Sequence, residues 1–391
     1  MAGGIVTEQD CTGKGNAFGV ILSEGRRPES KDLTPETVFS KKRRKCTLKI
    51  YVDAMGGDLA PEAPVKGALK ALRQYPGLEI ILAGKLDEVT PFLGDYDDVK
   101  DRLTLEEQPE VITNHESPVM GVRKKVNSAT VQGMLKVRSG EVDGFVSAGS
   151  TGATLAGGMF RLGRIPGVER PALAPLMPNG NGHFLLIDCG ANVDCKPEYL
   201  VQFGIMGDAY MKGVLGMKNP RIGLVNIGAE AEKGNKLVKE TYPLMEKAPY
   251  NFIGNVEARD VPLDQADVCV TDGFGGNLIL KYTEGLASAL MGTIKHELMA
   301  DTRGKIAGLI AKPAFKRVKK TMSSDEIGGA PLLGVQGAVI KAHGSSNAYA
   351  FCSAIGQCVK MIDGNVVKII EENVTKMLKE QEQDQKQEAE Q

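Results

Sequence analysis

Residues 48–58 read LKIYVDAMGGD, an apolar run that passes directly into two glycines between two aspartates. The run predicts a buried strand, and the polar turn marks where this strand ends. Gly56 and Gly57 allow the backbone to approach another segment closely. Ligands of open α/β sheets bind beyond the carboxyl ends of the strands, so we expect this turn to line a pocket.

Six more apolar runs predict strands, and they lie at residues 78–84, 142–149, 183–190, 221–228, 251–256 and 266–273. Segments with helical periodicity, such as 61–76 and 235–249, lie between them. Strands that alternate with helices predict a mostly parallel sheet covered on both faces. We therefore predict an α/β protein with a three-layer, Rossmann-like α/β/α fold.

Small and polar residues follow five more of these strands, at 147–153, 188–194, 226–235, 254–260 and 271–277. Six such loops predict one shared pocket. Glycine-rich turns before helices expose backbone N–H groups that favour anions. Ser150 and Thr151 can donate to such an anion or cap a helix. No turn fits the dinucleotide or P-loop fingerprints, which disfavours a dehydrogenase or a nucleotide enzyme.

The charged residues of these loops have two interpretations. Aspartates would repel phosphate, so we expect them to cap helices and hold loops, or to orient cations. Histidine and cysteine at metal-ligand spacing are absent, so we predict no metal, although a carboxylate Mg²⁺ site stays open. The candidate cations are Lys196, Lys233 and Arg259, and His343 is the best placed of the four histidines. A buried, inert thiol is favoured for Cys195 over a covalent relay.

The bulk composition excludes several classes of protein. The 391 residues carry a net charge of −1, which gives no global attraction to nucleic acid. No apolar run of about 18 residues predicts a transmembrane helix, and no secretory signal is present. The seven cysteines lack a CxxC pair, which is typical of reduced thiols in the cytoplasm.

The two ends of the chain differ from the region between them. Residues 1–46 mix Gly, Ser, Pro and charge, and they end near a basic pentamer at 41–45. We interpret them as a disordered leader or a non-native extension. Residues 371–391 form a polar, low-complexity tail that we expect to fray.

Seven blocks in order carry a family resemblance: VDAMGGDLAPEAPVKGA, SAGSTGA, GRIPGVERPALA, DCGANVDCKPEYLVQFG, NIGAEAEKGN, TDGFGGN and GGAPLLG with KAHGSS. Over residues 47–370 the chain resembles the bacterial phosphate acyltransferases of phospholipid synthesis. The resemblance implies one α/β/α domain like phosphate acetyltransferases and isopropylmalate dehydrogenases, a homodimer and no cofactor. It implies acyl transfer from acyl carrier protein to inorganic phosphate, which gives acyl phosphate for a membrane glycerol-3-phosphate acyltransferase.

The resemblance and the loop positions together give a set of expected site residues. We expect catalytic roles for Lys196, His343 and Asn192. We expect the substrate and phosphate site to include Asp53, Gly56, Gly57, Asp58, Ser150, Thr151, Gly152, Asp188, Lys233, Asp272, Gly273 and Asn277. Acyl carrier protein is acidic, so we expect Arg161, Arg164 and Arg170 to form its docking site.

Residues 301–320 are strongly basic, with seven Lys or Arg and one Asp. Basic amphipathic segments lie on anionic membrane surfaces. We expect a helical hairpin over 275–327 whose tip contacts the cytoplasmic face of the membrane. The contacting residues would be Ile306, Leu309, Ile310 and Phe315. An ordinary exposed helix tip that packs in a dimer is the alternative.

Two other functions stay open at this point. One is a phosphate acetyltransferase that acts on acyl-coenzyme A, against which the basic tip and the quoted blocks argue. The other is a non-catalytic scaffold recruited to membranes, which would not need polar loops at six strand ends.

Overall fold

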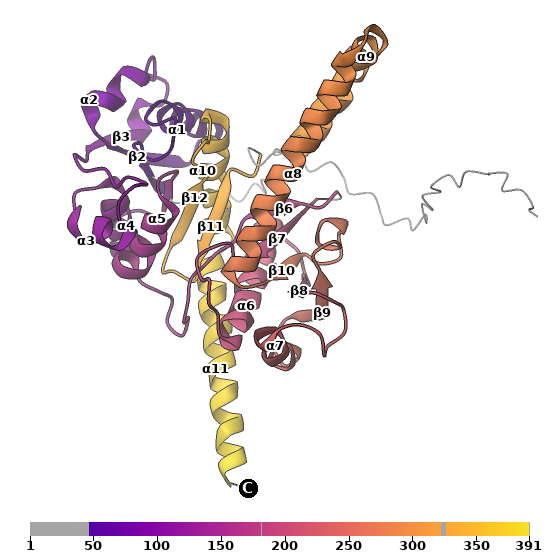
Figure 1. The fold of residues 1–391 in the computed structure, drawn as a ribbon. Coiled ribbons are helices and arrows are strands. Elements are labelled where there is room, and N and C mark those ends of the chain that lie inside the picture. The colour runs from indigo at the N-terminus through magenta and orange to yellow at the C-terminus, as the bar shows by residue number, and fades with distance from the viewer. Residues whose placement is uncertain (1–46, 181, 322–325, 391) are drawn as a thin grey trace, which may run out of the picture. The chain divides into compact units, whose positions relative to one another are not determined.

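The computed structural model describes residues 47–180, 182–321 and 326–390, and the leader lies outside them. The described strands fall into two sheets (Figure 1). The first sheet has the order β3-β2-β1-β4-β12-β11-β5, and β3, β2, β1, β4 and β12 run parallel. Its strands are β1 Leu48–Asp53, β2 Leu78–Gly84, β3 Leu103–Glu107, β4 Gly144–Ser147, β5 Ala172–Leu173, β11 Gly329–Leu333 and β12 Ala338–Ala342.

The second sheet has the order β6-β7-β10-β8-β9, and only its edge strand β6 is antiparallel among the described strands. Its strands are β6 Leu176–Pro178, β7 His183–Ile187, β8 Arg221–Asn226, β9 Asn251–Glu257 and β10 Val268–Val270. The short antiparallel strands β5 and β6 are edge strands of the first and the second sheet, and two residues separate them in the chain.

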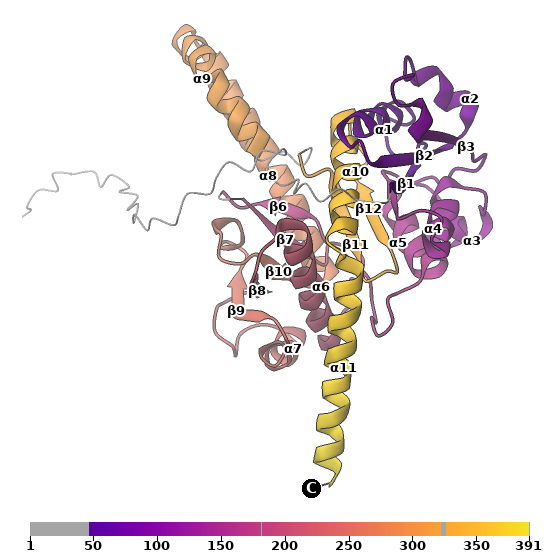
Figure 2. The ribbon, with the colours of Figure 1, turned by 180° about the vertical axis from the view of Figure 1, so that it is seen from behind.

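Helices cover both faces of these sheets. The α-helices are α1 Glu62–Gln74, α2 Leu86–Val89, α3 Pro118–Lys124, α4 Ala129–Ser139, α5 Thr151–Gly157, α6 Pro197–Leu215, α7 Lys236–Glu246, α8 Gly273–Ala300, α9 Thr302–Thr321, α10 Ala348–Asp363 and α11 Val366–Glu390. Short helical turns span Thr90–Phe92, Lys100–Arg102, Gly158–Leu162 and Val261–Leu263. Helices α1 and α10 pack together, α10 contacts α6, and α11 lies along α6 (Figure 2).

The alternation of side chains along β1 decides which core each residue joins. Ile50 and Val52 pack in the large core with α1 and α10, whereas Tyr51 points to the opposite face. There it joins Phe145 of β4 and Val339 of β12 under helix α4. Successive side chains of β1 point to opposite faces, and both faces are covered. The run LKIYV is therefore apolar at every buried position.

The predicted α/β fold with helices on both sides of mostly parallel strands is confirmed, and each of the seven predicted strands is present. Two features differ from the expectation. The strands divide between two sheets, and residues 371–390 continue helix α11 instead of fraying. Lys368–Glu372 and Lys376–Glu380 form i,i+4 pairs along that helix, which favour it over a coil.

Helices α8 and α9 form the hairpin that the sequence predicts within 275–327, and they pack against each other (Figure 1). Residues 322–325 lie outside the described part. Among the described helices, none combines the length and apolar character needed to span a membrane.

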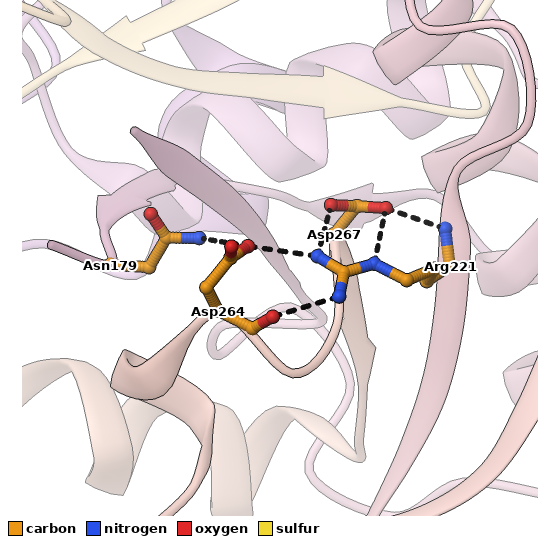
Figure 3. Close-up of polar contacts among 4 residues, drawn as sticks. All are labelled: Asn179, Arg221, Asp264 and Asp267. Atoms are coloured by element: carbon orange, nitrogen blue, oxygen red, sulfur yellow. Dashed lines mark hydrogen bonds and ion pairs between the residues drawn. The ribbon is translucent and has the colours of Figure 1, made fainter. Parts of the chain in front are cut away.

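A half-buried ion-pair cluster fixes the second sheet at the amino end of β8 (Figure 3). One edge of the Arg221 guanidinium meets the carboxylate of Asp267, with Nε and Nη2 at 3.0 and 2.8 Å from its oxygens. Nη2 also lies 2.8 Å from Asp264 Oδ1, which accepts a bond from Asn179. This bidentate arrangement holds the β9–β10 connection against β8, at the sheet end opposite the strand-end loops.

Candidate active site

A cavity of about 240 Å³ lies where the two sheets meet, at the carboxyl ends of β4, β7, β10 and β12. Its polar lining residues are Thr151, Asn277, Lys281, Glu284, Lys341, His343 and Ser346. Apolar lining residues include Leu173, Pro175, Leu176, Leu280, Ile327 and Ala330. Charged, polar and apolar side chains thus line one cavity.

The turn at residues 53–58 contacts the residues that follow two other strands, β4 and β12. The N–H of Asp58 donates to the carbonyl of Gly344 at 2.7 Å. A Cβ atom on Gly56 would lie 2.5 Å from the backbone nitrogen of Gly149, so only glycine fits there. Gly57 has a φ of +104°, which L side chains rarely adopt. The two glycines therefore bring β1, β4 and β12 to one edge of the cavity.

Asp53 is buried and serves these loops rather than the open cavity. Its carboxylate accepts hydrogen bonds from Ser147 Oγ at 2.8 Å, from Thr130 Oγ1 at 3.2 Å and from the Met55 N–H at 3.0 Å. Burial raises the pKa of Asp53, and these hydrogen bonds oppose the rise. The carboxylate therefore ties β1 to β4 and to helix α4.

Asp188 is also buried, and its hydrogen bonds fix the loop after β7. Its carboxylate accepts bonds from the N–H groups of Leu173 at 2.9 Å and Asn192 at 2.6 Å. The Asn192 side-chain amide donates to it at 3.0 Å and to the Pro171 carbonyl at 2.8 Å. Burial raises the pKa of Asp188 to about 6. Both amide N–H bonds of Asn192 are thus used in fixing the loop, and Asn192, predicted as a catalytic residue, does not line the cavity.

His343 lines the cavity at the end of β12. Its Nδ1 lies 2.8 Å from Ser345 Oγ and 3.3 Å from the Ser345 backbone nitrogen, whose N–H donates to it. An Nδ1 that accepts a backbone bond leaves the proton of a neutral imidazole on Nε2. His343 therefore presents Nε2 as a donor.

Lys341 is a site residue that we did not predict. It lies on β12, is only 8% exposed and lines the cavity two residues before His343. Its Nζ donates to the carbonyl oxygens of Ala148, at 3.4 Å, and Ala342. The sequence feature that could have identified Lys341 is its position inside the apolar run GAVIKAHG. A strand that is buried on both faces does not normally contain a charged side chain.

Several predicted residues lie at strand ends but do not line this cavity. Lys196 is exposed at the N-cap of α6, and Lys233 is exposed in an ion pair with Glu230. Ser150 caps α5, and a Cβ on Gly152 would lie 2.6 Å from Pro118. Asp272 caps α8 through the Gly275 N–H at 2.6 Å. In the described part of the chain, no group of three His, Cys, Asp or Glu is placed to hold a metal ion.

The family of the chain is decided by comparison with known proteins. A family model described as "Fatty acid synthesis protein" matches residues 48–369. A phosphate acyltransferase of Clostridium novyi (strain NT) is 47% identical over 319 residues, which are 82% of this chain and 96% of the relative. One of Alkaliphilus oremlandii (strain OhILAs) is 49% identical, with 82% and 95% covered. The chain belongs to the phosphate acyltransferase family. It is an acyltransferase.

Solved structures place the phosphate acyltransferase fold beside that of the phosphotransacetylases. A phosphotransacetylase from Streptococcus pyogenes matches with a TM-score of 0.54 at 17% identity, over 81% of this chain and 94% of the other. The EutD phosphotransacetylase from Staphylococcus aureus matches with a TM-score of 0.52 at 16% identity, over 81% and 93%. At these identities the likeness concerns the fold, and it confirms the predicted fold class.

Of the three arginines predicted to dock a carrier protein, Arg161 lies in the helical turn at 158–162, and Arg164 and Arg170 lie between this turn and β5. Arg161 donates to the carbonyl oxygens of Val122 and Arg123 at the end of α3. Arg164 donates to the Glu169 carbonyl, and Arg170 lies 5.8 Å from the centre of the Tyr199 ring. Arg164 and Arg170 are exposed, whereas Arg161 is half-buried.

The predicted tip residues lie on α9. Ile306, Leu309 and Ile310 are 56%, 71% and 77% exposed, and Phe315 is half-buried. A second apolar row runs along α8, where five large side chains spaced by four residues are all more than half exposed. This α8 row consists of Phe274, Leu278, Tyr282, Leu286 and Leu290.

Proposed function

We propose that this phosphate acyltransferase moves a fatty acyl group from the thioester of acyl carrier protein to inorganic phosphate. The products are acyl phosphate and the free carrier protein, and the acyl phosphate feeds phospholipid synthesis. The observation that carries the proposal is the cavity that cationic, hydrogen-bonding and apolar side chains line together. A fatty acyl phosphate has the same two parts, an anionic head and an apolar chain.

The chemistry of this transfer needs little from a protein nucleophile. Phosphate is already anionic near neutral pH, so it needs positioning rather than activation. A thiolate leaves without a strong acid because thiol pKa values lie near about 8.5. The remaining requirement is stabilisation of the oxyanion that forms at the thioester carbon, which hydrogen-bond donors and cations supply. His343 and Thr151 line the cavity, and an imidazole Nε2–H and a hydroxyl are donors of this kind.

Direct attack of phosphate on the thioester is favoured over a cysteinyl intermediate. Cys189 lines the cavity, but burial raises the pKa of its thiol well above the ordinary value. Burial also raises the pKa of Cys195 to about 12, and its thiol donates to the Asn192 carbonyl. Neither thiol is a thiolate at neutral pH, and the thiolate is the nucleophilic form.

Trapping of the product tests this function. Purified protein would be incubated with long-chain acyl carrier protein and phosphate, and hydroxylamine would convert acyl phosphate to a hydroxamate. Phosphate-dependent loss of thioester with hydroxamate supports the proposal. Turnover with acetyl-coenzyme A alone would overturn it in favour of a phosphate acetyltransferase. No turnover with either donor, together with tight liposome binding, would favour a scaffold. In the same assay, full activity of Lys196→Ala would remove Lys196 from the catalytic set.

We also propose two surfaces for this enzyme. The exposed apolar side chains of α9, with the basic residues around them, support contact with the cytoplasmic face of the membrane, where a glycerol-3-phosphate acyltransferase would take the product. The α8 row supports a homodimer, because contiguous exposed apolar side chains mark protein interfaces. Sedimentation of the Leu286→Glu variant tests the homodimer. A variant that still sediments with the mass of a dimer argues against this interface.

A further inference from the structure

Lys341 is a buried cation that makes no direct ion pair with a described carboxylate, and Asp53 and Asp58 act on it only at longer range. Its side chain is 8% exposed, and no described Asp or Glu lies within 4.0 Å of its Nζ. Buried charges are normally paired, because an unpaired one loses its hydration without compensation. We propose that the ammonium of Lys341 binds the inorganic phosphate that accepts the acyl group. This assignment rests on the proposed function.

The position of Lys341 follows from the register of the first sheet. Tyr51, Phe145 and Val339 lie side by side on β1, β4 and β12, on the face covered by α4. The side chains two residues further along these strands point to the same face, and they belong to Asp53, Ser147 and Lys341. An apolar layer thus changes to a polar one at the carboxyl ends, where ligands of α/β sheets bind.

The hydrogen bonds of Lys341 leave one donor for a ligand. An ammonium has three N–H donors. Two of them are used by the carbonyl oxygens of Ala148 and Ala342, which also fix the direction of the side chain. The cavity lies beside the same side chain. The third N–H is therefore free to form a charge-assisted hydrogen bond with a phosphate oxygen.

The charges around the cavity favour an anion near Lys341. Lys281 of α8 lines the same cavity, and its ammonium disfavours the charged form of Lys341. Glu284 compensates Lys281 at 2.9 Å, whereas Lys341 has only the more distant Asp53 and Asp58. An anion bound between the two lysines would relieve their repulsion. Thr151 and His343 supply further donors for its other oxygens.

The first experiment measures phosphate binding without catalysis. Equilibrium dialysis with radiolabelled inorganic phosphate would compare the full chain with Lys341→Met. We expect the variant to bind phosphate roughly 10- to 100-fold more weakly, the loss of one charge-assisted hydrogen bond. Lys236→Met is the matched comparison, because Lys236 is an exposed lysine of α7 that does not line the cavity. Equal binding by Lys341→Met, or an equal loss in Lys236→Met, would overturn the assignment.

Steady-state kinetics separate phosphate binding from stabilisation of the oxyanion. We expect Lys341→Met to raise the KM for phosphate about tenfold or more and to leave the KM for the acyl donor unchanged. A fall in kcat with an unchanged phosphate KM would overturn the phosphate assignment. Lys341→Gln provides the same comparison if the methionine variant does not fold. Wild-type protein that binds phosphate through Lys341 but makes no acyl phosphate would refute only the proposed function, and wild-type protein that binds no phosphate would refute this inference.

Discussion

A Cβ atom placed on Gly276 would lie 1.9 Å from the carbonyl oxygen of Asp188. The first turn of α8 and the loop after β7 therefore touch backbone to backbone. Asp188 fixes that loop by accepting the N–H groups of Leu173 and Asn192, and Asn277 follows Gly276 into the cavity wall. This contact sets the position of α8 relative to the rest of the site.

We expect Gly276→Ala to destabilise the protein by about 1–3 kcal/mol, because the added methyl group forces two backbone segments apart. Gly285→Ala is the control in the same helix, since a Cβ there meets nothing within 4 Å. It should stabilise the protein by about 0.5–1 kcal/mol through higher helix propensity. Urea unfolding measures both, and equal stabilities of the two variants would contradict the contact.

Lys341→Met should make the protein more stable while it loses phosphate affinity. Burial lowers the pKa of Lys341 to about 8 from 10.5, despite the attraction of Asp58 and Asp53. The folded form therefore holds this proton less tightly than the unfolded form, so the charge costs stability at pH 7, and the cost disappears as pH rises from 8 to 10.5. We expect a gain of about 1–3 kcal/mol at pH 7 that shrinks over that range. Unfolding at pH 7 and pH 10 measures it; a variant less stable at both would refute the prediction.

Reversal of the charge at the two exposed arginines tests carrier docking. Arg164→Glu with Arg170→Glu should raise the KM for acyl carrier protein about tenfold and leave that for acyl-coenzyme A unchanged, because only the carrier offers an extended acidic surface. Arg161 is left in place because its guanidinium caps α3. Lys236→Glu, at an exposed lysine on α7, is the control. Equal effects on both donors would argue against docking at this surface.

Aspartate at two tip positions tests membrane contact. Leu309→Asp with Ile310→Asp should weaken flotation with anionic vesicles about tenfold or more, since two exposed apolar side chains no longer enter the bilayer surface. Leu263→Asp is the matched control, because Leu263 is 69% exposed but lies outside the hairpin. Flotation that matches wild type, or that falls equally in the control, would contradict a specific tip.

The fold was predictable where the sequence contains continuous apolar runs. β1 and β2 begin and end within a residue of their predicted spans, because strands covered on both faces lack polar positions. β12 was not predicted, since Lys341 interrupts its apolar run. β5 and β6 have two and three residues, which are too few to show the alternation of side chains that identifies a strand in the sequence. The division into two sheets depends on such short edges.

The candidate site was predictable as a set of loops but less so as a set of side chains. Thr151, Asn277 and His343 were expected at strand ends, and all three line the cavity. Lys196 was expected there by the same argument, yet its side chain begins α6 on the exposed surface. Chain position places a residue at a strand end, whereas the direction of its side chain depends on local backbone angles that a single sequence does not reveal.

The bond from Asp58 to Gly344 has a consequence for synthesis on the ribosome. The turn at 53–58 is translated early, but its partner strand β12 is among the last segments to emerge. Until then β4 has an open edge where β12 will pair. A truncated nascent chain therefore presents an incomplete sheet to chaperones, and phosphate binding begins only after nearly the whole polypeptide has left the exit tunnel.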